Sequence, residues 1–167
     1  MNLWNLCSTA AGLSLVFSLC LVSDLRAQKR KAAPLASCDR QVVQGLKGLI
    51  FEVSGNQMPS PGKGVPIRKG VQREFGIFKL SNLNQAVKGK DDCFFKNPGT
   101  ALVKRARSDK NGCFALSLPP GKYSVFVREK GQWYANSFNG DGEICPVEVF
   151  PDSLSQLDFR INHGAWY

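Results

Sequence analysis

The sequence is poor in histidine: His163 is the single one among 167 residues. Protein zinc sites combine several His or Cys ligands at close spacing, and no Cys-x-x-Cys pair occurs here. A Ser/His/Asp or Cys/His site would have to use His163, and the Gly-x-Ser-x-Gly turn of many hydrolases is also absent. We therefore expect neither a metal site nor nucleophilic hydrolysis, and no cofactor.

Long hydrophobic runs are also scarce, and the one near the N-terminus is too short to cross a membrane comfortably. Residues 7–22 are small or apolar and carry no charge, as in the hydrophobic region of a secretory signal. Charged residues end the run, and Ala27 precedes a cleavage point ahead of Gln28. We predict a signal peptide over residues 1–27 and a protein exported to the periplasm, the cell surface or the medium, with no transmembrane span in the mature chain. A retained N-terminal anchor is the alternative.

Residues 28–44 are basic, contain Ala and Pro and show no periodicity, so we expect a flexible linker. The letters LASC at 35–38 have the form of a lipoprotein cleavage box, which would make Cys38 a lipidated N-terminus. Such a box directly follows the apolar run, whereas the charged letters RAQKRK intervene here. Lipid anchoring at Cys38 is therefore not expected.

Removal of the signal leaves four cysteines, which are Cys38, Cys93, Cys113 and Cys145. An even number in an exported chain of this size is typical of disulfides, and four cysteines allow three connectivities. Two disulfides are one interpretation, and free buried thiols among the four are the other.

The chain carries an excess of positive charge, with a net charge of +9. A basic protein outside the cytoplasm meets anionic polysaccharide, lipid headgroups or an acidic protein sooner than nucleic acid. We expect an unknown protein or an anionic polysaccharide of the cell envelope as the partner, and no nucleic acid. An evenly solvated basic surface is the alternative.

From Gly45 onward, short alternations of apolar and polar residues predict strands, and no sustained helical period occurs. In GLKGLIFEVSGN, the alternation of Leu49, Phe51 and Val53 predicts a strand with one buried face. About seven such strands, separated by turn residues, predict an all-β sandwich over residues 45–167.

The stretch SDKNGCFALSLPPGKYSVFV at 108–127 shows strong turn chemistry. Asn111-Gly112 favours the positive φ angles of a tight hairpin. The letters PPG at 119–121 end the following strand, because proline cannot donate to a β-ladder and glycine permits the reversal. The side chains that we expect on one inward face are Phe114, Leu116, Leu118, Tyr123, Val125 and Val127.

This stretch resembles the motif of the carboxypeptidase regulatory-like domain, a transthyretin-like Greek-key β-sandwich. The residues that carry the resemblance are Asp109, Gly112, Phe114, Leu118, Pro119, Pro120, Gly121 and Tyr123. The opening GLKGLIFEVSGNQMPSPG, the later WYANSFNGDGEICPVEV and the closing LDFRINHGAWY look like a small exported bacterial stand-alone subgroup, so the resemblance covers about residues 45–167. It implies the fold and a module that accompanies or supports other activities, without fixing a function.

Enzymes of related sandwich folds need residues that this chain does not have. Metallocarboxypeptidases and ring-cleaving dioxygenases need at least two histidine ligands, and hydroxyisourate hydrolases end in Tyr-Arg-Gly-Ser, whereas this chain ends in GAWY. We therefore expect a protein that is not an enzyme. A hydrolase or a metal-dependent enzyme remains as a weaker alternative.

Two acidic segments raise the question of calcium. SDKNG and NGDGE place oxygen ligands at alternate positions, as loops that bind hard cations do. Neither has the length or the terminal bidentate Glu of an EF-hand loop, so ordinary turns are the favoured interpretation of both.

The best surface candidates are Trp133, Tyr134, Asn136, Phe138 and Asp141. Exposed aromatic rings beside amides and a carboxylate are typical of a sugar-binding face, although rings that pack the end of the sandwich are the favoured interpretation. The Pro/Gly-rich loop over residues 58–70 is a second candidate surface, or a spacer. We expect an exported, non-catalytic module with a binding or structural role at the cell envelope, with carbohydrate binding through residues 133–141 as the alternative.

Overall fold

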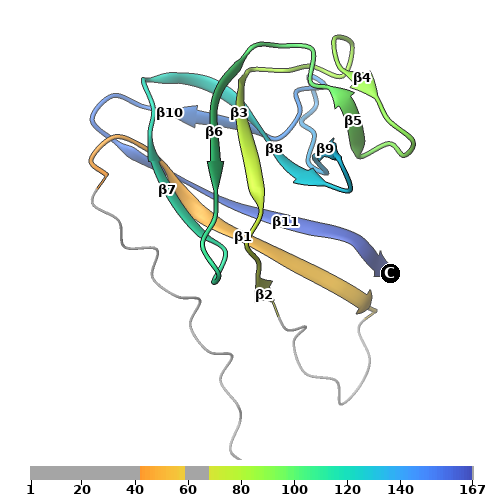
Figure 1. The fold of residues 1–167 in the computed structure, drawn as a ribbon. Helices are drawn as coiled ribbons and strands as arrows, with labels where there is room; N and C mark the ends of the chain where they lie inside the picture. The colour runs from red at the N-terminus through yellow and green to blue at the C-terminus, as the bar shows by residue number, and fades with distance from the viewer. Residues whose placement is uncertain (1–41, 59–67, 167) are drawn as a thin grey trace, which may run out of the picture. The chain divides into compact units, whose positions relative to one another are not determined.

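The computed structural model describes residues 42–58 and 68–166, and every regular element in these ranges is a β-strand. The strands form two sheets, shown in Figure 1, so the all-β sandwich expected from the alternations is present. The signal peptide, residues 28–41 of the linker and most of the Pro/Gly-rich loop lie outside the described residues. No helix in the described part of the chain is long and apolar enough to cross a membrane.

The first sheet is built on β1 (Gly45–Asn56). On one side, β1 pairs in parallel with β11 (Leu154–Trp166), and the two strands run side by side in Figure 1. On its other side, β1 pairs antiparallel with β7 (Cys113–Ser117) and then with β2 (Lys69–Gly70).

The second sheet contains seven strands. Their order is β4 (Val87–Lys88), β5 (Phe94–Asn97), β9 (Gln132–Tyr134), β8 (Gly121–Glu129), β3 (Glu74–Lys79) and β6 (Leu102–Arg107), with β10 (Pro146–Val149) paired to β8. The described residues thus hold eleven strands, compared with about seven expected. The difference comes from elements of two to four residues, which are too short to show an alternation.

The turn at Asn111-Gly112 does not close a hairpin, so that prediction was wrong. It connects β6 of the second sheet to β7 of the first, and residues 118–120 then lead the chain back into β8 of the second sheet. Gly112 has the expected positive φ of 82°. Both turns therefore carry the chain from one sheet to the other.

The side chain of Asp109 holds the first of these turns. Its Oδ1 accepts hydrogen bonds from the N–H groups of Asn111 at 2.9 Å and Cys113 at 2.8 Å. The carbonyl of Gly112 accepts a 2.8 Å bond from the N–H of Ile50 on β1. Because a Cβ on Gly112 would lie 2.1 Å from the carbonyl oxygen of Ile50, only glycine fits there. At the second turn, the Tyr123 hydroxyl donates to the carbonyl of Pro119 at 2.9 Å.

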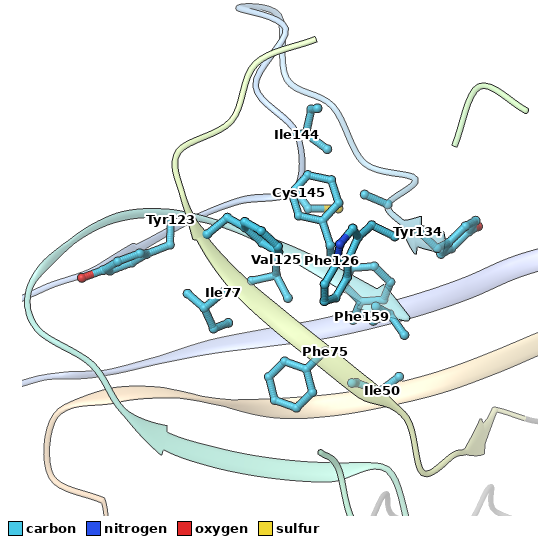
Figure 2. Close-up of a cluster of buried hydrophobic side chains, with 14 of the residues drawn as sticks. Ile50, Phe75, Ile77, Tyr123, Val125, Phe126, Tyr134, Ile144, Cys145 and Phe159 are labelled. Atoms are coloured by element: carbon cyan, nitrogen blue, oxygen red, sulfur yellow. The ribbon is translucent and has the colours of Figure 1, made fainter. Parts of the chain in front are cut away.

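The main core lies between the two sheets. Phe75 of β3 meets Phe114 of β7 with ring centroids 4.7 Å apart, and Tyr134 of β9 meets Phe159 of β11 at 6.4 Å. Figure 2 shows Phe75, Ile77, Ile50 and Phe159 within this cluster. The six side chains expected on one inward face, from Phe114 to Val127, are all buried in it.

The strand β1 is buried on both faces, which corrects the expectation of one buried face. Ile50 belongs to the main core, whereas Leu49, Phe51 and Val53 form a separate cluster with Cys113. The alternation predicted the separation of the two sets correctly. It could not show that the second face is also covered.

The last residue of the expected linker is anchored to the sandwich. The side-chain amide of Gln44 donates to the carbonyl of Leu118 at 3.0 Å, and its oxygen accepts the N–H of Asp152 at 3.1 Å. The side chain thus ties the entry of β1 to the corner before β8 and to the turn before β11.

Candidate functional site

The five residues proposed as a surface site do not form one surface. Trp133 and Tyr134 are neighbours on β9, so their side chains point to opposite faces of the second sheet. Both rings are buried, with 7% and 1% of their surface exposed. Of the three aromatic residues in the set, Phe138 alone is substantially exposed, at 39%.

Tyr134 points between the sheets and joins them. Its hydroxyl donates a 2.8 Å hydrogen bond to Oδ1 of Asn162 on β11, and the side-chain amide of Asn136 donates to the same oxygen. Burial raises the pKa of Tyr134 to about 12. This hydroxyl therefore stays protonated at ordinary pH and serves as a link between the two sheets.

Asn139 and Asp141 belong to a tight loop whose polar groups form hydrogen bonds with one another. Oδ1 of Asn139 accepts the N–H groups of Asp141 at 3.1 Å and Glu143 at 2.9 Å, and its amide donates to the Glu143 carboxylate at 2.6 Å. Oδ1 of Asp109 is occupied in the same manner at the other acidic turn. Within the described ranges, no group of three or more His, Cys, Asp or Glu residues is placed to hold a metal ion.

Trp133 lies on the face of the second sheet that points away from the first, together with two arginines. The guanidinium carbon of Arg128 lies 5.0 Å from the centre of the indole, and that of Arg105 on β6 lies 5.9 Å from it. Residues directly opposite each other on antiparallel strands share a face, and the pairs Arg128–Trp133 and Arg105–Gly76 place both arginines there. We call Arg105, Arg128 and Trp133 the arginine–indole surface.

Gly76 provides the space in which the indole lies. A Cβ on Gly76 would come within 3.0 Å of Trp133 and 3.1 Å of Leu102. Because Gly76 has no side chain, the ring of Trp133 can extend across β3 towards β6. Nothing in the local sequence around Trp133 points to this glycine, which lies far from it along the chain.

The charge on this surface is strongly positive. Arg105 forms an ion pair with Glu74 at 3.3 Å, and Arg107 follows on the same face of β6. Arg128 forms no ion pair with any residue in the described ranges and is exposed. Arg105 and Arg107 thus lie beside one carboxylate, and Arg105 and Arg128 lie over the same indole ring.

His163 is held by a buried carboxylate. Its Nε2 lies 3.3 Å from Oε2 of Glu129, whose side chain is 8% exposed, and Nε of Arg73 donates to the other oxygen of that carboxylate. The imidazole also packs against the rings of Phe94 at 5.8 Å and Tyr134 at 5.5 Å. The ring is thus a packed part of the sandwich that joins β11 to β8.

Two of the four candidate cysteines are free thiols. Cys93 is half-buried, and Cys145 is buried. Burial raises the pKa of Cys145 to about 11, and burial followed by the nearby Asp92 raises that of Cys93. Cys113 is disulfide-bonded, and Cys38 lies outside the described residues. Cys93 and Cys145 are therefore free thiols and do not form a disulfide with each other.

In comparisons with known proteins, no family model, no curated protein and no solved structure matches this chain. The function is therefore argued from the arginine–indole surface itself. Sequence reasoning found Trp133, but it did not connect this residue with Arg105 and Arg128. The missing information was the register of β6, β3, β8 and β9, which brings Arg105 and Arg128 to the same ring.

Proposed function

We propose that this protein is an exported, non-catalytic β-sandwich module that binds an anionic polysaccharide of the cell envelope through the arginine–indole surface. The observation that carries the proposal is the convergence of Arg105 and Arg128 on the indole of Trp133. Among the described residues, Glu74 is the one carboxylate that forms an ion pair with either arginine, so the two like charges on one ring leave a positive excess that an anionic ligand neutralises.

The chemistry of these side chains favours carboxylated sugars. A guanidinium group presents a planar fork of donors that matches a carboxylate in a bidentate arrangement. Packing on the indole holds each fork in place, so less side-chain freedom is lost on binding. A sheet face with arginines on β6 and β8, on either side of β3, suits a polymer whose charge repeats along its length.

Binding of a neutral sugar through residues 133–141 has less support. That mode needs an aromatic ring open to solvent, and Trp133 is 7% exposed beneath the arginines. Tyr134 points between the sheets. The ring of Phe138 packs against that of Phe95, with ring centroids 6.5 Å apart. The ring of Phe138 is therefore the single open platform in that region.

Export and a transthyretin-like Greek-key arrangement are part of the proposal. Export is supported by the apolar segment over residues 7–22. The family resemblance rests on the residues around PPG at 119–121, which here turn the chain between the sheets. A supporting module is the role that this resemblance implies.

The test is a binding titration of the mature protein with polygalacturonate, and with neutral dextran as the control polymer. We expect saturable binding to polygalacturonate that weakens as salt is added, because exposed charges are screened, and no binding to dextran. Arg128→Ala and Arg105→Ala should each weaken binding about tenfold, the size of a lost charged hydrogen bond.

Lys110→Ala is the matched control, since Lys110 is an exposed cation on the turn at Asn111 and is not one of the residues of the arginine–indole surface. It should leave the affinity within about twofold. Equal losses in the lysine and arginine variants would mean that net charge alone is responsible and would overturn the assignment of this surface. Binding of dextran and polygalacturonate alike would overturn the proposed ligand class.

A further inference from the structure

The strand β11 has one paired edge and one edge that no described residue pairs with. In the first sheet the order is β11-β1-β2, so β11 lies at the side of the sheet, as Figure 1 shows. Its neighbour β1 occupies one edge from Gly45 to Asn56. A long strand with a free edge presents a row of backbone donors and acceptors to an incoming strand.

The backbone groups that face the free edge can be assigned by alternation. A Cβ on Gly48 of β1 would lie 1.7 Å from the carbonyl oxygen of Leu157, so the backbone of Leu157 is directed to β1. The N–H of Asn162 instead reaches the Tyr134 hydroxyl of the other sheet at 3.4 Å, away from β1. Since backbone groups alternate along a strand, the N–H and C=O of Asp158 and Arg160 point to the free edge.

A groove runs along this edge. It encloses a volume of ≈ 560 Å³, and four consecutive residues of β11, Leu157 to Arg160, line it. Successive side chains point to opposite faces of a sheet, so a groove that touches all four follows the edge of the strand. Across from them, Asn136, Ser137 and Pro146 form one wall, and Phe51 with Arg68 contributes to the other.

The charge in the groove is predominantly positive. Arg160 lies opposite Phe51 in the register of β11 and β1, and the guanidinium of Arg68 lies 5.3 Å from the centre of the Phe51 ring. Neither arginine forms an ion pair with a residue in the described ranges, and Asp158 is the one acidic side chain that lines the groove there. Two cations beside an open strand edge suit a peptide with acidic side chains.

We propose that the free edge of β11 binds an extended acidic segment of a partner protein, which joins the first sheet as an added strand. Backbone hydrogen bonds to Asp158 and Arg160 pair the incoming strand with β11, and the guanidinium groups of Arg68 and Arg160 select acidic side chains. The site belongs to the first sheet, whereas the arginine–indole surface belongs to the second. The proposal therefore stands independently of polysaccharide binding.

The experiment uses the mature protein and a fluorescent heptapeptide in which Glu alternates with Val, followed by anisotropy. A peptide with Lys in place of Glu is the control. We expect saturable binding of the acidic peptide and at least tenfold weaker binding of the basic one. Arg160→Glu should reverse this preference, whereas Lys90→Glu, at an exposed position in the turn between β4 and β5, should leave it unchanged.

A second pair of variants tests the backbone pairing. Asp158→Pro removes an N–H that faces the free edge, and proline is tolerated at such positions on edge strands. It should abolish binding at an unchanged melting temperature, whereas Asp158→Ala keeps the N–H and should bind the acidic peptide at least as well. If Asp158→Pro lowers the melting temperature, amide exchange of the native protein is measured instead. The N–H groups of residues 158 and 160 should then exchange more slowly once the acidic peptide is added.

Three results would overturn the proposal. The first is equal affinity for the acidic and basic peptides, and the second is binding that neither Arg160→Glu nor Asp158→Pro alters. The third is a dimer in sedimentation that Asp158→Pro dissociates, because the edge would then pair with a second copy of this chain.

Discussion

The hydroxyl of Tyr134 and the side-chain oxygen of Asn162 lie 2.8 Å apart and join the two sheets through one hydrogen bond. Tyr134 comes from the three-residue strand β9, and Asn162 from the long strand β11. The N–H of Asn162 approaches the same hydroxyl at 3.4 Å. The side chain of Tyr134 thus links the short strand β9 of the second sheet to β11 of the first sheet.

Tyr134→Phe should lower the free energy of unfolding by about 1 kcal/mol, the usual net value of one hydrogen bond in a protein. The ring remains to pack against Phe94 and Phe159, so the loss is confined to the hydroxyl. Urea unfolding at pH 7 measures the difference. A loss above about 3 kcal/mol would mean that the ring itself has moved.

Stability should fall as the pH rises above about 9. The pKa of Cys145 is raised from 9.0 to about 11, and that of Tyr134 from 10.0 to about 12, in both cases by burial. The unfolded chain therefore loses these protons at a lower pH than the native protein, and each group lowers the free energy of unfolding by up to about 1.4 kcal/mol per pH unit in its window. Urea unfolding of the native protein and of a Tyr134→Phe/Cys145→Ala variant from pH 7 to pH 11 should show a smaller fall in the variant. Parallel curves would contradict the assignment.

Glu129→Gln should destabilise the protein by about 2 kcal/mol, because Arg73 loses its charged partner beside a buried site. Arg73 keeps a weaker contact with Glu52 at 3.6 Å, which limits the loss. Asp92→Asn is the matched control, since the pair of Asp92 with Lys88 is exposed and should contribute less than about 0.5 kcal/mol. Thermal unfolding of the two variants compares them, and equal shifts would show that Glu129 is not a buried anchor.

Gly112→Ala should destabilise the protein by more than about 3 kcal/mol, because strain from the positive φ adds to a clash with the carbonyl of Ile50. Gly131→Ala provides the comparison: Gly131 has a φ of 78° but open space around its Cβ, so the expected cost is about 1 kcal/mol. Denaturant unfolding of both variants separates the clash from the strain. Similar values for the two would mean that β1 yields at Ile50.

The turns could be predicted from the sequence because their chemistry is local. Asp109 caps its own loop, and Gly112 has the positive φ that its identity suggests. The sheet to which each flanking strand belongs is not a local property. Alternation places Phe114 on an inward face equally well in a hairpin and in a crossing between sheets, so the pairing of β7 with β1 and not with β6 could not be foreseen.

The candidate site was harder to predict because its parts come from distant strands. Trp133 and Tyr134 were grouped because they are adjacent in the sequence, and β9 is too short for its alternation to separate them. Arg105 and Arg128 meet over Trp133 only because Gly76 leaves room between β8 and β6. The contact depends on the absence of a side chain at Gly76, which lies on a third strand, and such a dependence leaves no pattern in the sequence.

The parallel pairing of β1 with β11 has a consequence for how the protein is made. It joins the first and the last strand of the described residues, with Gly45 beside Leu154 and Ile50 beside Phe159. Contacts between distant parts of a chain form slowly, because the long loop between them must close first. Because β11 follows every other strand of the described residues, the first sheet can be completed only after β11 has been synthesised, whereas all strands of the second sheet precede it.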